Sequence, residues 1–277
     1  KMTLATLTGL LIFGFVMTSI IGGIIGGLAA IGKQTAVVPA SAVLTMDMST
    51  ITLAEQTIEM DPLSMIQSKG TEIQPLGIYS AIQAINIAAE DPAIKYIYMK
   101  PDRTSGGIAQ IEELRTALVH FRERGKAIVS YIESPSNAAY YLASVSDKIY
   151  MTCHDGGMNN FCGISSNMMF LKDLLDKLGI NVQLIRHGKY KSAGEMFIRN
   201  SPSKENMEQN KAMINSIWNK ICNDISIARN IKVETINQLA DNLTLMFDAQ
   251  AAVDNGFVDE LIYKDELLCI VIIRVFS

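Results

Sequence analysis

The sequence predicts an α/β fold with a substantially parallel sheet, preceded by one N-terminal transmembrane helix. Short apolar segments typical of strands alternate with helical patterns between residues 36 and 263. Strands that are separated by helices usually pair in parallel, because the helix carries the chain back to the same end of the sheet. We find no internal repeat and no second domain in this stretch. The predicted organisation is an anchor at 1–33, one domain at 34–266 and a tail at 267–277.

The predicted anchor is a long stretch without charge at the start of the chain. No charged residue occurs from Met2 to Gly32, and Leu10–Ile31 is dense in large apolar residues and glycine. A bilayer core requires about 20 such residues, so this segment is long enough to span a membrane. A cleaved signal peptide would have a shorter apolar region. Lys1 and Lys33 flank the segment on both sides, so charge alone does not determine its orientation.

In the first part of the domain, period-two and helical patterns define the elements. Lys95–Met99 is rich in Ile and Tyr, as strands are, and the apolar face from Ile108 to Phe121 indicates a helix that ends before Gly125. The region 47–74 is mixed and polar, so we expect loops there. The other expected elements are a strand at Ala36–Leu44, a helix from Ile78 to Ala89, a strand at Ala127–Ile132, a helix at Ala138–Ala143 and a strand at Lys148–Met151.

In the second part, Ser203 is the expected N-cap of a long helix whose inward face carries apolar residues from Met207 to Ala228. The run Leu267–Phe276 is apolar without a period. A final strand is one interpretation of it, and we favour a natural chain that continues beyond it. The other expected elements are a helix at Met168–Leu178, a strand at Val182–Ile185, helices at Val233–Ala240 and Asp248–Asn255, and a strand at Phe257–Tyr263.

Composition and cysteine spacing exclude several classes of protein. The 277 residues are 49% hydrophobic and 19% charged, with a net charge of −4 and no long basic run, so we expect neither disorder nor nucleic-acid binding. The four cysteines form no CxxC pair and the three histidines are scattered, which argues against a metal site. Disulfides remain open, but we favour buried free thiols. The dinucleotide, Walker A and GxSxG motifs are absent as well.

Two segments have the composition of a catalytic site. Ser105-Gly106-Gly107 follows a strand and precedes a helix, so its N–H groups could face an oxyanion, although glycine pairs in turns mostly serve conformation. Arg186–Phe197 follows a predicted strand and contains Lys189 and Lys191. A lysine acts as a base only where a dry environment favours its neutral form. Both lysines could equally be solvated loop charges, since lysine is rarely buried.

The order of these blocks along the chain carries a specific resemblance. The chain resembles the signal peptide peptidase A family, in particular the N-terminal half of its long, two-repeat, membrane-anchored form. Its fold is similar to that of the ClpP and crotonase proteins, with repeated β-β-α units. The resemblance extends from the anchor to about Tyr263. The blocks that carry it are Tyr140–Ser144, Asp147–Tyr150, Leu174–Ile180 and Gly188–Phe197.

The resemblance implies a serine peptidase with a Ser–Lys dyad and no metal or cofactor. The lysine of the block Tyr190-Lys191-Ser192-Ala193 would be the general base, and Lys189 would be a rim residue. In the long form, the nucleophilic serine lies in the C-terminal half, which this sequence lacks. From the neighbouring residues, Tyr190, Met196 and Phe197, we expect an apolar wall around the lysine, because only a neutral amine can take the serine proton.

One departure from the family pattern decides what the chain does alone. Short family members carry their serine where this chain has Asn137, which cannot form an ordinary acyl-enzyme. Ser136 and Ser144 lie nearby, and nothing in the sequence favours either as a substitute. A second departure is Met196, where the family often has proline. We therefore predict that the isolated chain is inactive.

The resemblance also implies partners and a location. The expected partners are the C-terminal half of the same peptidase, further copies in a bowl-shaped oligomer (a tetramer by resemblance), apolar or signal-peptide substrates and a lipid bilayer. The expected location is the bacterial inner membrane, with a single span and the domain on the extracytoplasmic side. One alternative is a non-catalytic, membrane-anchored scaffold of the same fold, favoured by Asn137. A crotonase-like acyl-CoA enzyme is another, supported only by fold analogy.

Overall fold

The computed structural model describes residues 13–20, 22–23, 41–49, 51–54, 74–154 and 157–269. The chain divides into two compact units, 1–40 and 41–277. In the first unit, residues 13–20 and 22–23 are helical, and the rest of the predicted anchor lies outside the described residues. Among the residues that the structure describes, no helix has the length and apolar character needed to cross a membrane.

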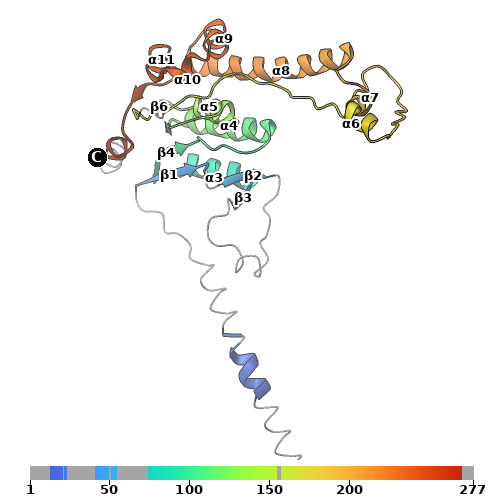
Figure 1. The fold of residues 1–277 in the computed structure, drawn as a ribbon. Helices are drawn as coiled ribbons and strands as arrows, with labels where there is room; N and C mark the ends of the chain where they lie inside the picture. The colour runs from blue at the N-terminus through green and yellow to red at the C-terminus, as the bar shows by residue number, and fades with distance from the viewer. Residues whose placement is uncertain are drawn as a thin grey trace, which may run out of the picture. The chain divides into compact units, whose positions relative to one another are not determined.

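The second unit is built on a five-stranded sheet, in the order β1-β4-β5-β6-β7 (Figure 1). Every pairing in it is parallel, which confirms the predicted α/β fold with a parallel sheet. The register places Val43 of β1 beside Tyr96 of β4, and Tyr96 beside Ala127 of β5. The strands are β1 (Ala42–Asp47), β4 (Ile94–Lys100), β5 (Ala127–Ile132), β6 (Lys148–Met151) and β7 (Glu260–Leu261).

Side-chain alternation along the strands separates two apolar clusters. Ile97 and Met99 of β4 belong to the main core, whereas Tyr96 and Tyr98 belong to a smaller cluster with Tyr131. Successive strand residues point to opposite faces, so these clusters lie on the two sides of the sheet. In the first part of the chain, the helices that contribute buried residues to the main core are α3 (Ile78–Glu90), α4 (Ile108–Glu123) and α5 (Asn137–Ala143); helices later in the chain contribute to it as well.

The second part of the chain is dominated by α8 (Lys204–Arg229), a helix of 26 residues. Ser203 is its N-cap as predicted, and its hydroxyl oxygen accepts a hydrogen bond from Asn206 N at 3.1 Å. Figure 1 shows α6 and α7 near the start of α8, and α9 beside its end. The remaining helices are α6 (Lys172–Lys177), α7 (Glu195–Ile198), α9 (Val233–Asp241), α10 (Thr244–Phe247) and α11 (Ala249–Asp254).

Several predicted elements differ from the structure. The region 47–74, which was expected to be loops, contains β2 (Ile51–Ala54), and β3 (Gln74–Gly77) starts at its last residue. The two strands form a separate two-stranded parallel sheet. The strand predicted at Val182–Ile185 is wrong: the segment has no regular structure, and the side chain of Ile185 is 91% exposed. Strand-forming residues need a neighbouring strand to complete their hydrogen bonds, and no described strand lies beside this segment.

The bounds of other elements also differ from the predicted ones. The helix predicted at Met168–Leu178 is limited to α6, and the last predicted strand is limited to the two residues of β7. Residues 264–269 are helical, and 270–277 lie outside the described residues. The expectation of buried thiols holds for Cys222 alone; Cys153 is half-buried, whereas Cys162 and Cys269 are exposed.

Candidate active site

Lys191 lies in an exposed loop between α6 and α7, within the segment Arg186–Phe197. Gly188 begins the loop with φ of +100°, a left-handed conformation that glycine adopts without strain. Lys191 N then donates to Gly188 O at 3.4 Å, which closes a turn over Lys189 and Tyr190. The Lys191 side chain is exposed, and its amine makes no hydrogen bond or ion pair with any residue that the structure describes. The loop therefore holds the lysine backbone while leaving its amine available.

Two shallow pockets flank this loop where it lies against α8. One, of about 370 Å³, is lined by Lys191, Gln209 and Met213, among others. The second, of about 300 Å³, is lined by Met168, Met169, Phe170 and Met196. Both share Ser192, Ala193 and Asn210. Methionine-rich walls adapt to apolar groups of varied shape, so one side of the second pocket is an adaptable apolar surface, while Ser192, Asn206 and Asn210 add polar groups.

The apolar wall expected around Lys191 is not formed by the residues that the structure describes. Tyr190 is 53% exposed, and its hydroxyl turns to α8, where it donates to Glu208 Oε2 at 2.9 Å. That hydrogen bond raises the pKa of Tyr190. Phe197 is exposed and Met196 is half-buried. These side chains are exposed or half-buried, so they do not form the expected dry wall around Lys191.

Glu195 is the buried charge of this region, and the sequence analysis gave it no role. It begins α7, and its side chain is 1% exposed. Its Oε2 accepts from Ser203 N at 3.0 Å and from Asn206 Nδ2 at 3.2 Å, while Oε1 accepts from Arg186 Nη1 at 3.0 Å. Burial acts to raise the pKa of Glu195, but the hydrogen bonds from Ser203, Arg186 and Asn206 outweigh it and lower the pKa to about 2.

Arg186 connects this carboxylate to the lysine. Its Nη1 atom donates both to Glu195 Oε1 and to the backbone carbonyl of Lys191, each at 3.0 Å. The sequence contained both residues inside the block of interest. Their separation by nine positions in a segment without regular structure gave no signal that they would meet.

Asn137, which the resemblance places where short family members have their serine, has a structural role here. Its Nδ2 donates to Gly163 O at 2.6 Å, and its Oδ1 accepts from Cys162 N at 3.1 Å. Ser136 is the N-cap of α5 and accepts from Ala139 N, and Ser144 is fully buried and donates to Tyr141 O. Neither serine is placed as a nucleophile, which agrees with the sequence analysis.

The Ser105-Gly106-Gly107 turn lies at the start of α4. Gly107 N donates to Gln110 Oε1 at 2.8 Å, so the helix itself uses this N–H group. Gly106 has φ of +152°, and a Cβ built there would lie 3.2 Å from Leu53 Cβ. The geometry therefore supports the conformational role of these glycines, which is to close the turn against β2.

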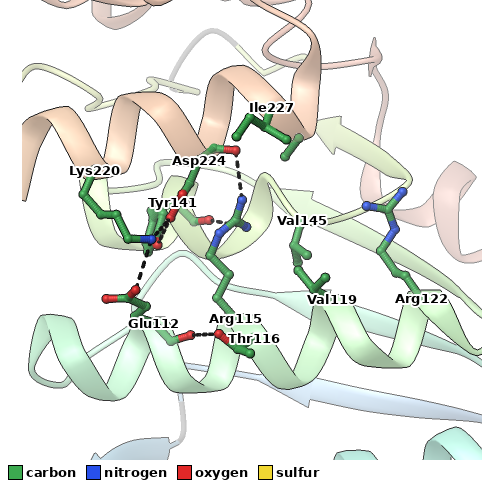
Figure 2. A pocket seen from close by; sticks show the side chains of 11 residues that line it. Glu112, Arg115, Thr116, Val119, Arg122, Tyr141, Val145, Lys220, Asp224 and Ile227 are labelled. Atoms are coloured by element: carbon green, nitrogen blue, oxygen red, sulfur yellow. Dashed lines mark hydrogen bonds and ion pairs between the residues drawn. The ribbon is translucent and has the colours of Figure 1, made fainter.

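A further pocket, of about 480 Å³, lies where α4, α5 and α8 meet (Figure 2). Its cations are already satisfied: Lys220 pairs with Glu112 and Asp224, and Arg122 pairs with Asp147. Arg115 is 6% exposed and donates to the carbonyls of Tyr141 and Asp224. These contacts join three helices, so we interpret the pocket as a structural junction. No group of three or more metal-ligating side chains occurs in the described part of the chain.

Comparison with known proteins gives one family. A model described as peptidase family S49 matches residues 120–270, more than half of the chain. "Protease 4" of Haemophilus influenzae is 32% identical over 58% of this chain and 26% of its own length. "Serine protease SPPA, chloroplastic" of Arabidopsis thaliana is 29% identical over 65% of this chain and 26% of its own. The chain thus spans about a quarter of either relative.

Shorter relatives and solved structures were also found. "Putative signal peptide peptidase SppA" of Enterococcus faecium is 24% identical over 65% of this chain and 51% of its own length. An enoyl-CoA hydratase from Shewanella pealeana covers 72% of this chain and 63% of its own, with a TM-score of 0.39 and 12% identity. So distant a likeness does not bear on the chemistry of this chain.

Proposed function

This chain belongs to peptidase family S49, and on that premise we propose that it is the N-terminal, lysine-bearing part of a membrane-bound serine endopeptidase that degrades cleaved signal peptides. Lys191 is the general base in this proposal, and the nucleophilic serine belongs to the C-terminal half of the same peptidase. The fold would be of the ClpP/crotonase type.

The observation that carries the proposal is the fixed backbone and unpaired amine of Lys191. Its loop is tied by backbone hydrogen bonds, and its amine projects from the loop without a partner among the described residues. A lysine with only a solubility role does not need a fixed backbone. The neighbouring pockets at Ser192 and Ala193 offer a place for a substrate or a second protein segment.

The proposed chemistry moves one proton in a cycle. The serine hydroxyl attacks the carbonyl carbon of the scissile peptide bond while its proton passes to Nζ of Lys191. The C–N bond then breaks, and the leaving amine takes that proton. Water hydrolyses the acyl-serine in the second stage, with the lysine amine accepting a proton and returning it to the serine oxygen.

The proposal requires assembly before catalysis. The exposed amine of Lys191 is in contact with water here, and only a neutral amine can take the serine proton. A partner that closes over Tyr190, Met196 and Phe197 would exclude that water. We propose that this partner is the C-terminal half, within an oligomer anchored to the bacterial inner membrane by residues 1–33, with apolar peptides as substrates. The isolated chain would be inactive.

The test is to co-express this chain with the C-terminal half and measure peptide hydrolysis. We expect Lys191→Ala to lower kcat/KM on the order of 10³-fold or more, by analogy with the loss of one member of a serine triad. Lys189→Ala is the matched control, because it removes the same charge two positions away in the same exposed loop. Near wild-type activity of the Lys191→Ala variant would exclude this residue as the base.

A non-catalytic scaffold is the alternative, and the structural role of Asn137 favours it. It predicts an assembly that forms in the membrane but hydrolyses no peptide with any second half. Lys191→Ala would then change neither assembly nor activity. Hydrolysis that depends on Lys191 would exclude this alternative.

A further inference from the structure

The strongest unexplained feature of the site is a buried carboxylate within an exposed segment. Residues 185–191 are all exposed, yet the Glu195 side chain is almost completely inaccessible. Glutamate is almost never fully buried unless it is paired, because removing a carboxylate from water is costly. The three hydrogen bonds to Glu195 meet that cost, and their donors come from two places in the chain: Arg186 in the lysine loop, and Ser203 and Asn206 at the start of α8.

One side of Glu195 is fixed to the start of α8. Ser203 N, the backbone group of the N-cap, and Asn206 Nδ2 both donate to Oε2. A helix N-terminus favours a negative charge, because its N–H groups are unpaired and its dipole is positive there. Asn206 also accepts from Asn210 Nδ2 at 2.6 Å, and Asn210 lines both pockets beside the lysine loop. The buried carboxylate is therefore connected through Asn206 to Asn210, a residue that lines the pockets beside the lysine loop.

The other side of Glu195 holds the lysine loop at two points. Glu195 N donates to Ser192 O at 2.9 Å, directly after the lysine. Arg186, held by the carboxylate, donates to the carbonyl of Lys191 itself. The backbone of the lysine is thus connected through Arg186 and Glu195 to the first turn of α8.

We propose that Glu195 is a positioning residue for Lys191, acting with Arg186 to fix the backbone of the lysine loop on the start of α8. This inference rests on the proposed function, in which Lys191 is the base. A base must lie within hydrogen-bond distance of the serine hydroxyl, and a displacement of about 1 Å can lower the rate about 100-fold. Glu195 itself touches neither substrate nor nucleophile.

The first experiment measures kinetics in the assembled peptidase. Glu195→Gln keeps the shape of the side chain but removes its charge, and we expect kcat to fall on the order of 10-fold to 100-fold with KM within about twofold. Arg186→Ala should behave alike, whereas Arg186→Lys should recover part of the activity. Glu234→Gln, the same change at an exposed position in the first turn of α9, is the matched control.

The second experiment separates positioning from general damage. In a Lys191→Ala background, Glu195→Gln should cause no further loss of residual activity, since two residues that act through one group are not additive. Amide hydrogen exchange of this chain alone should show faster exchange at 188–194 in Glu195→Gln, with unchanged exchange in β4 and β5.

The outcomes distinguish the two proposals. If Lys191→Ala retains activity, the proposed function fails whatever Glu195 does. If Lys191→Ala is inactive but Glu195→Gln matches wild type in kcat and in loop exchange, the positioning role is excluded and the base assignment stands. Equal losses from Glu195→Gln in the presence and absence of Lys191 would also overturn the positioning role.

Discussion

The two ends of α8 are held in different ways. The C-terminal half buries Ile221, Cys222 and Ile225 in the main core, and Trp218 Nε1 donates to Asn237 of α9 at 2.8 Å. Around the first turns, the buried residues are polar: Asn206, the N-cap Ser203 and the carboxylate that they bind. One end is fixed by apolar packing, and the other by a small hydrogen-bonded network.

This difference between the two ends of α8 accounts for the exposure of the lysine loop. Apolar packing in the core stabilises the fold whether or not a partner is present. A loop fixed by a few polar contacts keeps its backbone conformation but leaves its side chains accessible. The C-terminal half of α8 (the body end) therefore contributes to stability, and under the proposed function its first turns (the lysine end) contribute to positioning Lys191. Substitutions at the two ends should therefore affect different measurements.

The largest expected loss of stability comes from a substitution in the buried C-terminal half of α8. Ile225 is fully buried in the main core, so Ile225→Ala should lower the free energy of unfolding by about 2–5 kcal/mol. Met207→Ala is the matched control on the same helix, because Met207 is 58% exposed, and its effect should be within about 0.5 kcal/mol. Denaturant unfolding of the two variants checks this. Equal losses would show that both ends are packed alike.

A second substitution tests the junction in Figure 2. Arg115 donates to two carbonyls, and its guanidinium lies 4.8 Å from the centre of the Tyr141 ring. Arg115→Ala should cost about 1–3 kcal/mol, since it removes two hydrogen bonds to backbone carbonyls and the packing of the side-chain stem. Arg122→Ala, which breaks a partly exposed pair with Asp147, should cost at most about 1 kcal/mol. If Arg122→Ala lowers the unfolding temperature more than Arg115→Ala does, Arg115 is not the main link between the three helices.

These two ends also show what the sequence could predict. Ile221 and Ile225 recur at helical spacing, so the buried C-terminal half of α8 was predicted correctly, and the local N-cap signal at Ser203 correctly gave the start of the helix. Met207 continues the same apolar pattern and was predicted to face inward, but it is exposed. Periodicity identifies an apolar face without showing whether anything in the chain covers it.

The sequence predicted which residue forms the candidate site, but not the contacts that hold that residue in place. The family blocks led to Lys191, but the contacts that hold its loop join Arg186, Glu195 and the start of α8. Such contacts depend on tertiary structure, and no local spacing encodes them. The strand expected at Val182–Ile185 failed for the same reason, because strand propensity does not supply a neighbouring strand.

The pH dependence of the lysine loop tests whether the Glu195 carboxylate holds that loop on the start of α8. The pKa of Glu195 is about 2 in the fold against an ordinary value of 4.5, so its stabilising effect is complete above about pH 4.5 and is lost as the pH falls towards 2. Protection of 188–194 from hydrogen exchange, corrected for the intrinsic rate, should be constant from pH 7 to 5. Below that it should fall by at most about tenfold per pH unit.

Glu195→Gln is the control for this pH series. The variant should show low protection at every pH, because its side chain does not titrate. A wild-type loop that keeps its protection at pH 2, or a variant that follows the wild-type curve, would contradict the role of Glu195. Asp224 at the body end also has a lowered pKa, through hydrogen bonds from Lys220 and Tyr141 that outweigh burial. The comparison must therefore follow the loop itself and not global unfolding.

The smallest expected effect concerns the close approach of the lysine loop to residue 184. A Cβ built on Gly194 would lie 2.5 Å from Leu184 Cδ1, a contact that real side chains do not make. The obstacle is the branched end of the half-buried Leu184 side chain, with Cδ2 at 2.9 Å and Cγ at 3.3 Å as well, and this flexible side chain can rotate away. Gly194→Ala should therefore cost no more than about 1 kcal/mol in stability. Its main effect should be faster hydrogen exchange at 188–194, and Leu184→Ala should restore the wild-type rate in the double variant by removing that branched end. A Gly194→Ala loop that exchanges as slowly as wild type would show that the polar contacts of Glu195 fix the loop without this packing.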